Sequence, residues 1–425
     1  MTDRYELAMA DSYVAAGIAG DRVAFELFVR DLPPPFGYLL SAGLASAESY
    51  LRTLRFGAES LAYLEEERIC GPAALAALAE LRFDGDVDAV AEGSVVFAGE
   101  PLLRVDGSRL VCQLVESHLL NQVNFQTLIA TKAARMVDAA DGRGVVDFGY
   151  RRAHGSDAGL LAARSAYIGG CAGSATVAAG YLWGIPTLGT MAHSYVMAFT
   201  DQVTAFRRFL RDRPEESTLL IDTYDAVGGA RAAVEASRAE GIVPQMVRLD
   251  SGSASELSRD VRAVLDDGGL GSTGIFCSGD LDEYEIARLV ADGAPIDGFG
   301  VGTRLTTGWD VPALGGVYKL VESAGRPVMK TSPGKATLPG RHQVFRDGDG
   351  DVIGLAGEHL PGRPLLEPVL RAGEPVADLP ALADIRDRAG RERDALPDEV
   401  RRPTAPLTRR PRHSEQLAAL VGDLV

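Results

Sequence analysis

The sequence predicts an α/β fold in which parallel βαβ units form a barrel or a near-barrel. Seven apolar runs follow one another at intervals of about 22 to 40 residues, with helical stretches such as 228–240 and 256–266 between them. Strands that alternate with helices at this spacing are typical of a parallel sheet. The runs begin near Val145, Ile185, Leu219, Met246, Gly274, Ile296 and Pro327.

Residues 1–140 predict an α+β domain. Helical periodicity covers 5–16 and 112–139, and alternating apolar residues at 23–29 predict a strand. Short strands are expected around 95–97 and 102–105. Residues 141–340 would then form the α/β barrel catalytic domain.

The C-terminal segment 341–425 lacks the regular alternation of apolar runs and helical stretches. Residues 361–415 are rich in Pro, Arg and Asp and show no apolar period, while 414–424 predict a short helix. We expect this segment to fold back and complete the N-terminal domain.

The composition of the chain bounds its function. The 425 residues are 46% hydrophobic and carry a net charge of −16, which argues for a globular protein and against a nucleic-acid surface. Four widely spaced cysteines without a C-x-x-C motif predict reduced thiols and a cytoplasmic location. No signal peptide is expected at the N-terminus, and the apolar stretch 155–184 predicts a buried helix and not a membrane span.

Chemically useful side chains follow the apolar runs, where the carboxyl ends of parallel strands meet. Arg151 and Arg152 follow the first run together with Phe148. Two guanidiniums beside an aromatic face suit a flat anionic substrate. Alternatively, the arginines are surface charges or pair with Asp147.

His193 lies in a second such motif, Gly189-Thr190-Met191-Ala192-His193-Ser194. Its position at a strand end suits acid–base or nucleophilic chemistry, although a lone histidine is more often structural. Among the other histidines, only His154 lies close to one of these motifs.

Carboxylates recur at three further strand ends, as Asp222 and Asp225, then Asp250, then Asp280. They suit Mg²⁺ or ribose hydroxyls, whereas a single one would more simply cap a helix. Arg248 and Asp250 are two residues apart and therefore share one strand face.

A glycine turn, Phe299-Gly300-Val301-Gly302-Thr303, follows a later run. Its backbone N–H groups suit a phosphate, although glycines also simply permit tight turns. The basic, glycine-containing loop 330–335 is compatible with a ligand-binding role and, equally, with an ordinary solvated surface loop.

Ordered motifs over most of the chain make the sequence similar to the nicotinate phosphoribosyltransferase family, type II phosphoribosyltransferases related to nicotinamide phosphoribosyltransferase. The likeness runs from the N-terminus to about Arg346 and includes the strand-end motifs above. It also includes Thr2-Asp3-Arg4-Tyr5, Glu92-Gly93-Ser94-Val95-Val96-Phe97, Glu100-Pro101-Leu102-Leu103-Arg104-Val105 and 124–132.

The resemblance implies an incomplete TIM-like α/β barrel, a first domain that contains β-structure, and a homodimer with active sites at the subunit interface. It implies that nicotinate and phosphoribosyl pyrophosphate give nicotinate mononucleotide and pyrophosphate in NAD biosynthesis. ATP hydrolysis through a phosphohistidine and a requirement for Mg²⁺ are also implied.

The resemblance further assigns roles to residues. Phe148 and Tyr5 of the partner subunit would sandwich the pyridine ring, Arg151 would bind its carboxylate, and His193 would be phosphorylated. Arg248 and Asp250 resemble the ribose-binding pair. The remaining expected site residues are Arg152, Ser174, Thr190, Asp222 and Asp280 (the last two in the phosphoribosyl and Mg²⁺ region), and Gly279, Gly300, Gly302 and Thr303 in the 5′-phosphate loops.

Comparison of the same motifs with the family pattern gives an expectation about which substrate is preferred, and it shows one departure from that pattern. The stretch 173–176 has no carboxylate where the nicotinamide relative has an Asp, which favours the acid over the amide. Ser253 stands where the family often has an acidic residue. The alternatives are transfer to nicotinamide or another pyridine carboxylate, and a non-catalytic ligand-binding relative.

Overall fold

The computed structural model describes residues 2–348 and 350–424, which form two compact units. Unit 1 comprises Met1–Leu128, Ala313–Val400 and Leu407–Val425, and unit 2 comprises Ile129–Pro312 and Arg401–Pro406. The division therefore falls at 128 and 313 and not at the expected 140 and 340. The first boundary lies inside one continuous helix, α6 (Glu116–Ala139), which apolar periodicity cannot divide.

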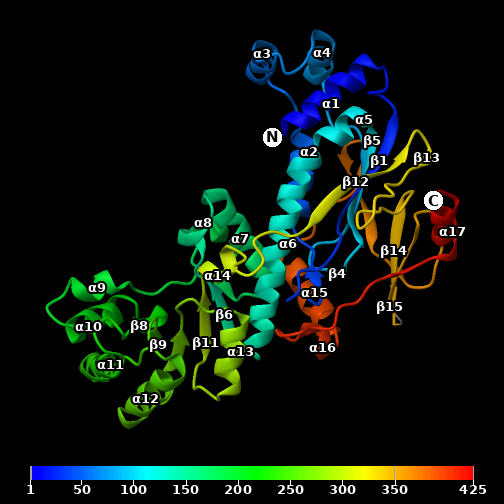
Figure 1. Cartoon of the computed structure of the whole chain (residues 1–425). Coiled ribbons are helices and arrows are strands. Elements are labelled where there is room, and N and C mark those ends of the chain that lie inside the picture. The colour runs from blue at the N-terminus through cyan, green and yellow to red at the C-terminus, as the bar shows by residue number, and fades with distance from the viewer. Residues whose placement is uncertain (1, 349, 425) are drawn as a thin grey trace. The chain divides into compact units, whose positions relative to one another are not determined.

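Unit 1 is built on a seven-stranded antiparallel sheet that joins both ends of the chain (Figure 1). C-terminal strand β17 pairs with N-terminal strand β3, and β12 pairs with β1. The C-terminal segment thus completes the N-terminal fold. In spatial order the strands are β13 (Arg326–Pro327), β12 (Gly316–Ser323), β1 (Arg22–Val29), β5 (Pro101–Ser108), β3 (Asp86–Val90), β17 (Leu366–Arg371) and β18 (Glu374–Pro375).

Two smaller sheets and a set of helices complete unit 1. The four-stranded sheet has the order β16 (Arg363–Pro364), β14 (His342–Asp347), β15 (Gly350–Leu355) and β19 (Arg412–His413), and β2 (Leu39–Leu40) pairs with β4 (Val95–Val96). The helices are α1 (Arg4–Ala15), α2 (Leu44–Thr53), α3 (Ala58–Glu66), α4 (Pro72–Glu80), α5 (Arg109–Leu114), α15 (Leu382–Asp394), α16 (Asp398–Arg401) and α17 (Glu415–Leu424).

Unit 2 contains the parallel sheet. Its six strands have the order β7 (Gly173–Ser174), β6 (Gly144–Asp147), β11 (Gly298–Val301), β10 (Gly274–Cys277), β9 (Met246–Leu249) and β8 (Thr218–Leu220). Every pairing is parallel. No pairing between β7 and β8 occurs in the described residues, so the sheet is an incomplete barrel. Its strands are short and mostly buried, as expected for a parallel sheet covered by helices.

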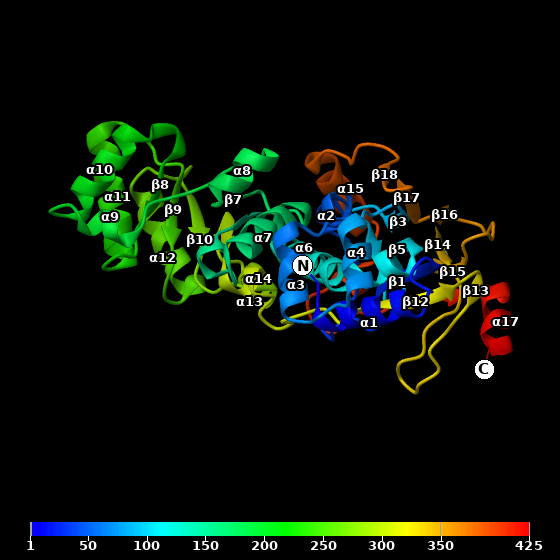
Figure 2. The same cartoon turned by 90° about the horizontal axis from the view of Figure 1, so that it is seen from above.

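Helices connect these strands. Helices α10 (Gln202–Asp212), α11 (Ala226–Glu240) and α12 (Ala254–Asp267) pack side by side next to β8 and β9 (Figure 2). The other helical segments are η1 (Tyr150–Arg152), α7 (Ser156–Ile168), α8 (Val177–Trp183), α9 (His193–Met197), η2 (Pro214–Glu216), α13 (Glu283–Ala291) and α14 (Thr303–Thr306).

Three sequence-based expectations for this region are wrong. The run at 185–188 contributes only an isolated bridge between Thr187 and Ser174, and the strand beside β6 is the two-residue β7. The run at Pro327 forms β13, which belongs to the antiparallel sheet of unit 1. The stretch 155–184 is not one buried helix but α7, the short strand β7 and α8, and α8 exposes Val177 and Tyr181.

None of the helices in the described part of the chain combines the length and the apolar character that crossing a bilayer requires.

Candidate active site

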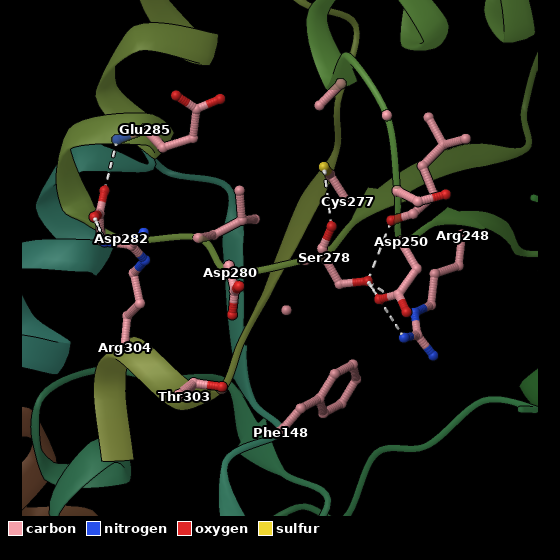
Figure 3. A pocket seen from close by; sticks show the side chains of 18 of the residues that line it. Phe148, Arg248, Asp250, Cys277, Ser278, Asp280, Asp282, Glu285, Thr303 and Arg304 are labelled. Carbon is pink, nitrogen blue, oxygen red and sulfur yellow. Dashed lines mark hydrogen bonds and ion pairs between the residues drawn. The ribbon is translucent and has the colours of Figure 1, made fainter. Parts of the chain in front are cut away.

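A cleft of about 800 Å³ lies at the carboxyl ends of β6, β9, β10 and β11 in unit 2 (Figure 3). Parallel strands present their functional side chains at this end. Ten of the residues expected from the sequence line it: Phe148, Arg151, Arg152, Arg248, Asp250, Gly279, Asp280, Gly300, Gly302 and Thr303.

Arg248 and Asp250 form the expected pair on one wall of this cleft (Figure 3). Arg248 Nη2 donates to Asp250 Oδ1 at 2.6 Å, and the Ser278 hydroxyl donates to the same oxygen at 2.6 Å. Burial raises the pKa of Asp250, but these hydrogen bonds and the charges of Arg248 and His193 outweigh burial and lower it below the ordinary value. Asp250 is therefore an ionised acceptor.

Thr190, His193 and Asp222 adjoin this pair. Arg248 Nη1 donates to Thr190 Oγ1 at 3.0 Å, and His193 Nε2 lies 3.8 Å from Asp250 Oδ2. His193 Nδ1 lies 3.2 Å from Thr223 Oγ1, and its side chain is 42% exposed. Asp222 Oδ2 accepts the backbone N–H of Asp250 at 2.9 Å. The structure thus brings the segment after the 185–188 run and the ends of β8 and β9 into one hydrogen-bonded group.

Phe148 provides the flat apolar surface in the cleft. Its ring is tilted against Phe276, with the centroids 5.8 Å apart, and the Arg248 guanidinium carbon lies 5.7 Å from its centroid. A Cβ at Gly300 would lie 2.9 Å from atoms of both rings. Only glycine at position 300 therefore leaves room for the ring of Phe148.

Asp147 and Ser174 do not line the cleft. The Ser174 hydroxyl donates to Asp147 Oδ2 at 2.7 Å and accepts the backbone N–H of Thr176. Both side chains are buried. The structure therefore places the Ser174 hydroxyl outside the cleft, where it is hydrogen-bonded within the protein.

Arg151 and Arg152 are exposed on η1 and line the cleft. Within the described residues neither makes an ion pair, and Asp147 instead accepts from Ser174 and from Gly149 N–H at 2.8 Å. The alternative in which the arginines pair with Asp147 is therefore wrong. Tyr5 lies on α1 of unit 1 with 47% of its surface exposed.

The opposite wall of the cleft is a turn and a second ion pair. Gly279 and Asp280 both have positive φ, of 108° and 50°, and a Cβ at position 279 would lie 2.4 Å from Asp250 O. Arg304 Nη1 donates to Asp282 at 2.9 Å, and Asp282 also caps α13 (Figure 3). Polar groups therefore surround an open centre toward which Asp280 points.

Sequence reasoning missed several residues of this site. Ser278, Asp282 and Arg304 each adjoin an expected motif, so strand-end position was a usable signal. Phe276 lies inside a strand, and nothing in the sequence distinguishes it from an ordinary core residue.

The described residues hold no cluster of three or more His, Cys, Asp or Glu side chains with the geometry of a metal site. Asp222 Oδ1 is nevertheless buried without a hydrogen-bond partner among them. Mg²⁺ commonly uses one or two carboxylates together with substrate phosphates. The donor set therefore fits a cation that arrives with a phosphorylated substrate.

Comparison with known proteins agrees with this geometry. Residues 1–124 match the nicotinate phosphoribosyltransferase (NAPRTase) N-terminal domain, and residues 129–310 match the quinolinate phosphoribosyl transferase C-terminal domain. The Mycobacterium tuberculosis nicotinate phosphoribosyltransferase pncB2 is 46% identical over 94% of this chain and 88% of its own length. The Bacillus subtilis nicotinate phosphoribosyltransferase is 40% identical over 84% of this chain and 76% of its own length.

Solved structures give the same result. The crystal structure of human nicotinic acid phosphoribosyltransferase aligns over 100% of both chains with 31% identity and a TM-score of 0.88. Nicotinate-nucleotide pyrophosphorylase from Pyrococcus furiosus aligns over 93% of this chain and 94% of its own, with 26% identity and a TM-score of 0.78. The chain belongs to the nicotinate phosphoribosyltransferase family, a family of phosphoribosyltransferase enzymes.

Proposed function

We propose that this chain joins nicotinate to the phosphoribosyl group of phosphoribosyl pyrophosphate and releases pyrophosphate, a step of NAD biosynthesis. The observation that carries the proposal is one cleft lined by the Phe148 ring, by Arg151 and Arg152, which make no ion pair among the described residues, and by the Arg248–Asp250 pair. Phe148 would support the pyridine ring, and Arg151 would bind the carboxylate.

The residues of the cleft suit the reaction at the anomeric carbon. The transition state is oxocarbenium-like, so it requires a positioned pyridine nitrogen and an anionic environment at the sugar. Asp250, held ionised by Arg248 and Ser278, would accept ribose hydroxyls and fix the ring. Gly300, Gly302 and Thr303 would lie against the 5′-phosphate, where the absence of side chains on the glycines lets the phosphate approach the backbone.

We propose Asp222 and Asp280 as the residues that would hold Mg²⁺ with the pyrophosphate group. The partnerless Oδ1 of Asp222 and the exposed carboxylate of Asp280 support this assignment. When bound, the cation would neutralise charge that accumulates on the leaving pyrophosphate.

ATP coupling through His193 is also a proposal. The side chain of His193 is half-exposed, its Nδ1 is held at Thr223, and its Nε2 lies next to Asp250. An imidazole fixed through one nitrogen presents the other for phosphoryl transfer. Because His193 lies next to the Arg248–Asp250 pair, phosphorylation would alter the charge at the ribose site.

A homodimer is supported by exposed apolar residues in unit 2. Val177, Tyr181 and Leu182 on α8 are 74%, 88% and 53% exposed. Apolar side chains gathered on one short helix are typical of a surface that another protein covers. We propose that a second copy of the chain covers α8, and that Tyr5 of the partner subunit completes the pyridine site.

A cytoplasmic location is proposed from the cysteines. All four are buried and free, which is the usual condition in a reducing compartment.

The test is pyrophosphate release by purified protein with phosphoribosyl pyrophosphate and Mg²⁺, comparing nicotinate with nicotinamide, each with and without ATP. We expect nicotinate-dependent release that ATP stimulates. Release with nicotinamide but not with nicotinate would indicate that the enzyme uses the amide as its substrate. Release with neither pyridine would contradict the proposal.

A further inference from the structure

Unit 1 contains a second cleft, of about 1110 Å³, that shares no lining residue with the active-site cleft. Among the described residues, seven arginines line it, against three carboxylates. The whole chain has a net charge of −16, so this cleft reverses the sign of the protein's average charge. A local excess of one charge in a concavity concentrates ions of the opposite sign.

Two of the carboxylates are already neutralised. Arg346 binds Asp351 at 2.5 Å and Glu392 at 2.9 Å, and Arg363 also binds Glu392. Arg410 pairs with Asp31, which does not line the cleft. These contacts use two of the three lining carboxylates together with Asp31, and leave four of the seven arginines over.

Four guanidiniums remain without an ion pair among residues 2–348 and 350–424. Arg388 and Arg391 lie one turn apart on α15 and therefore on the same helix face. Arg409 and Arg412 lie on the segment that enters β19, where Arg412 pairs with Val352 of β15. Arg388 also donates to the Glu92 carbonyl at 2.8 Å, which fixes its direction.

This arrangement is electrostatically unfavourable without a counter-ion, because like charges in a shared concavity repel one another. Guanidinium groups bind phosphate oxygens through paired hydrogen bonds, which is why arginine clusters recognise phosphates. One phosphate would leave much of the charge uncompensated, whereas a chain of phosphates carries enough. Val95, Leu396 and Pro411 also line the cleft and offer an apolar surface beside the arginines.

We propose that this cleft binds a small molecule that carries a chain of phosphates, as in inorganic tripolyphosphate or a nucleoside triphosphate. Its volume lies slightly above the range for small-molecule sites, roughly 300–1,000 Å³, which leaves room for a nucleotide. The site lies in unit 1 and is separate from the chemistry of unit 2.

The experiment is calorimetric titration of the full chain at low ionic strength, in separate arms with tripolyphosphate and with ATP. The double variant R391Q/R409Q replaces two guanidiniums that make no ion pair among the described residues with shorter, neutral amide side chains. The matched control is R386Q, because Arg386 is on the same helix and does not line the cleft. Any binding at the active site persists equally in both variants, so their difference reports this cleft alone.

We expect the double variant to bind at least about tenfold more weakly than R386Q in one or both arms, since each lost charge-assisted contact is worth about that factor. Similar weakening in both arms would indicate that the phosphate chain is recognised by itself. A stronger effect with ATP would indicate that the apolar wall contacts the base. Equal binding by the two variants, or no binding by the wild-type chain, would overturn the proposal.

Discussion

The buried carboxylate of Asp147 accepts a hydrogen bond from the Ser174 hydroxyl at 2.7 Å, joining the ends of β6 and β7. Asp147 also accepts the backbone N–H of Gly149, two residues before Arg151. Burial raises the pKa of Asp147, and the hydrogen bonds from Ser174 and Gly149 act in the opposite direction. The expected carboxylate-binding arginine is thus positioned by a residue that does not reach the cleft.

Replacing Asp147 with Ala would leave two buried donors without an acceptor. We expect the free energy of unfolding to fall by about 1–3 kcal/mol and the nicotinate KM to rise as Arg151 loses its position. Urea denaturation and steady-state kinetics measure both effects. Asp260→Ala, at an exposed position of α12, is the control; equal losses in the two variants would contradict the role of Asp147.

Replacing Gly300 with Ala would place a Cβ 2.9 Å from the rings of Phe148 and Phe276. One of these rings must move, at a cost of about 1–3 kcal/mol for an overpacked site. We expect a lower kcat/KM for nicotinate, measured as pyrophosphate release. Gly144→Ala is the control on the adjacent strand, since a Cβ there meets no atom within 4 Å.

Replacing Arg151 with Ala removes an exposed guanidinium that has no ion pair among the described residues, so little stability should be lost. We expect the nicotinate KM to rise about tenfold or more, as for the loss of one charge-assisted contact, with a much smaller change in the phosphoribosyl pyrophosphate KM. If both constants rise equally, the substrate carboxylate binds elsewhere.

Replacing His193 with Ala should abolish the stimulation by ATP and leave slow ATP-independent turnover, since the reaction at the sugar does not itself use the imidazole. The measurement is pyrophosphate release as a function of ATP concentration. His154→Ala, at an exposed position just after the arginines, should retain full stimulation. Unchanged coupling in the His193 variant would remove its proposed role.

Glu240 gives a pH prediction outside the active site. Hydrogen bonds from Arg211 and Arg207 lower its pKa to about 2. Because the folded-state value lies below the unfolded one, its contribution to stability is present above about pH 4.5 and is lost as the pH falls toward 2. The difference in unfolding free energy between wild type and Glu240→Gln should therefore shrink over this range, while Glu235→Gln on the same helix should show no such change.

Local spacing allowed much of the site to be predicted. Arg248 and Asp250 share a strand face because they are two residues apart, and that relationship holds in any strand. Asp147 and Ser174 are brought together by a two-residue strand that is too short to show periodicity. Contacts of that kind depend on tertiary packing and cannot be derived from spacing.

Local sequence patterns also predicted where strands of the fold lie, but not which strands pair with one another. An apolar run predicts a strand but not its partner, so Pro327 was assigned to the parallel sheet although β13 pairs with β12 in the other unit. The C-terminal segment 341–425 was expected to fold back on the N-terminal domain because it lacks the alternation of strands and helices. Its strands, and the register of β17 on β3, follow only from the structure.

The ring of Phe148 lies against the main chain of β11 at Gly300, with the side chains of Phe276 and Arg248 beside it. A strand backbone within a paired sheet is among the least deformable parts of a protein, so the depth of the ring is fixed by the sheet itself. The tilt of the Phe148 ring is set by its contact with the side chain of Phe276. Adapting this site to a pyridine of different shape would therefore begin with Phe276, a residue that does not line the cleft.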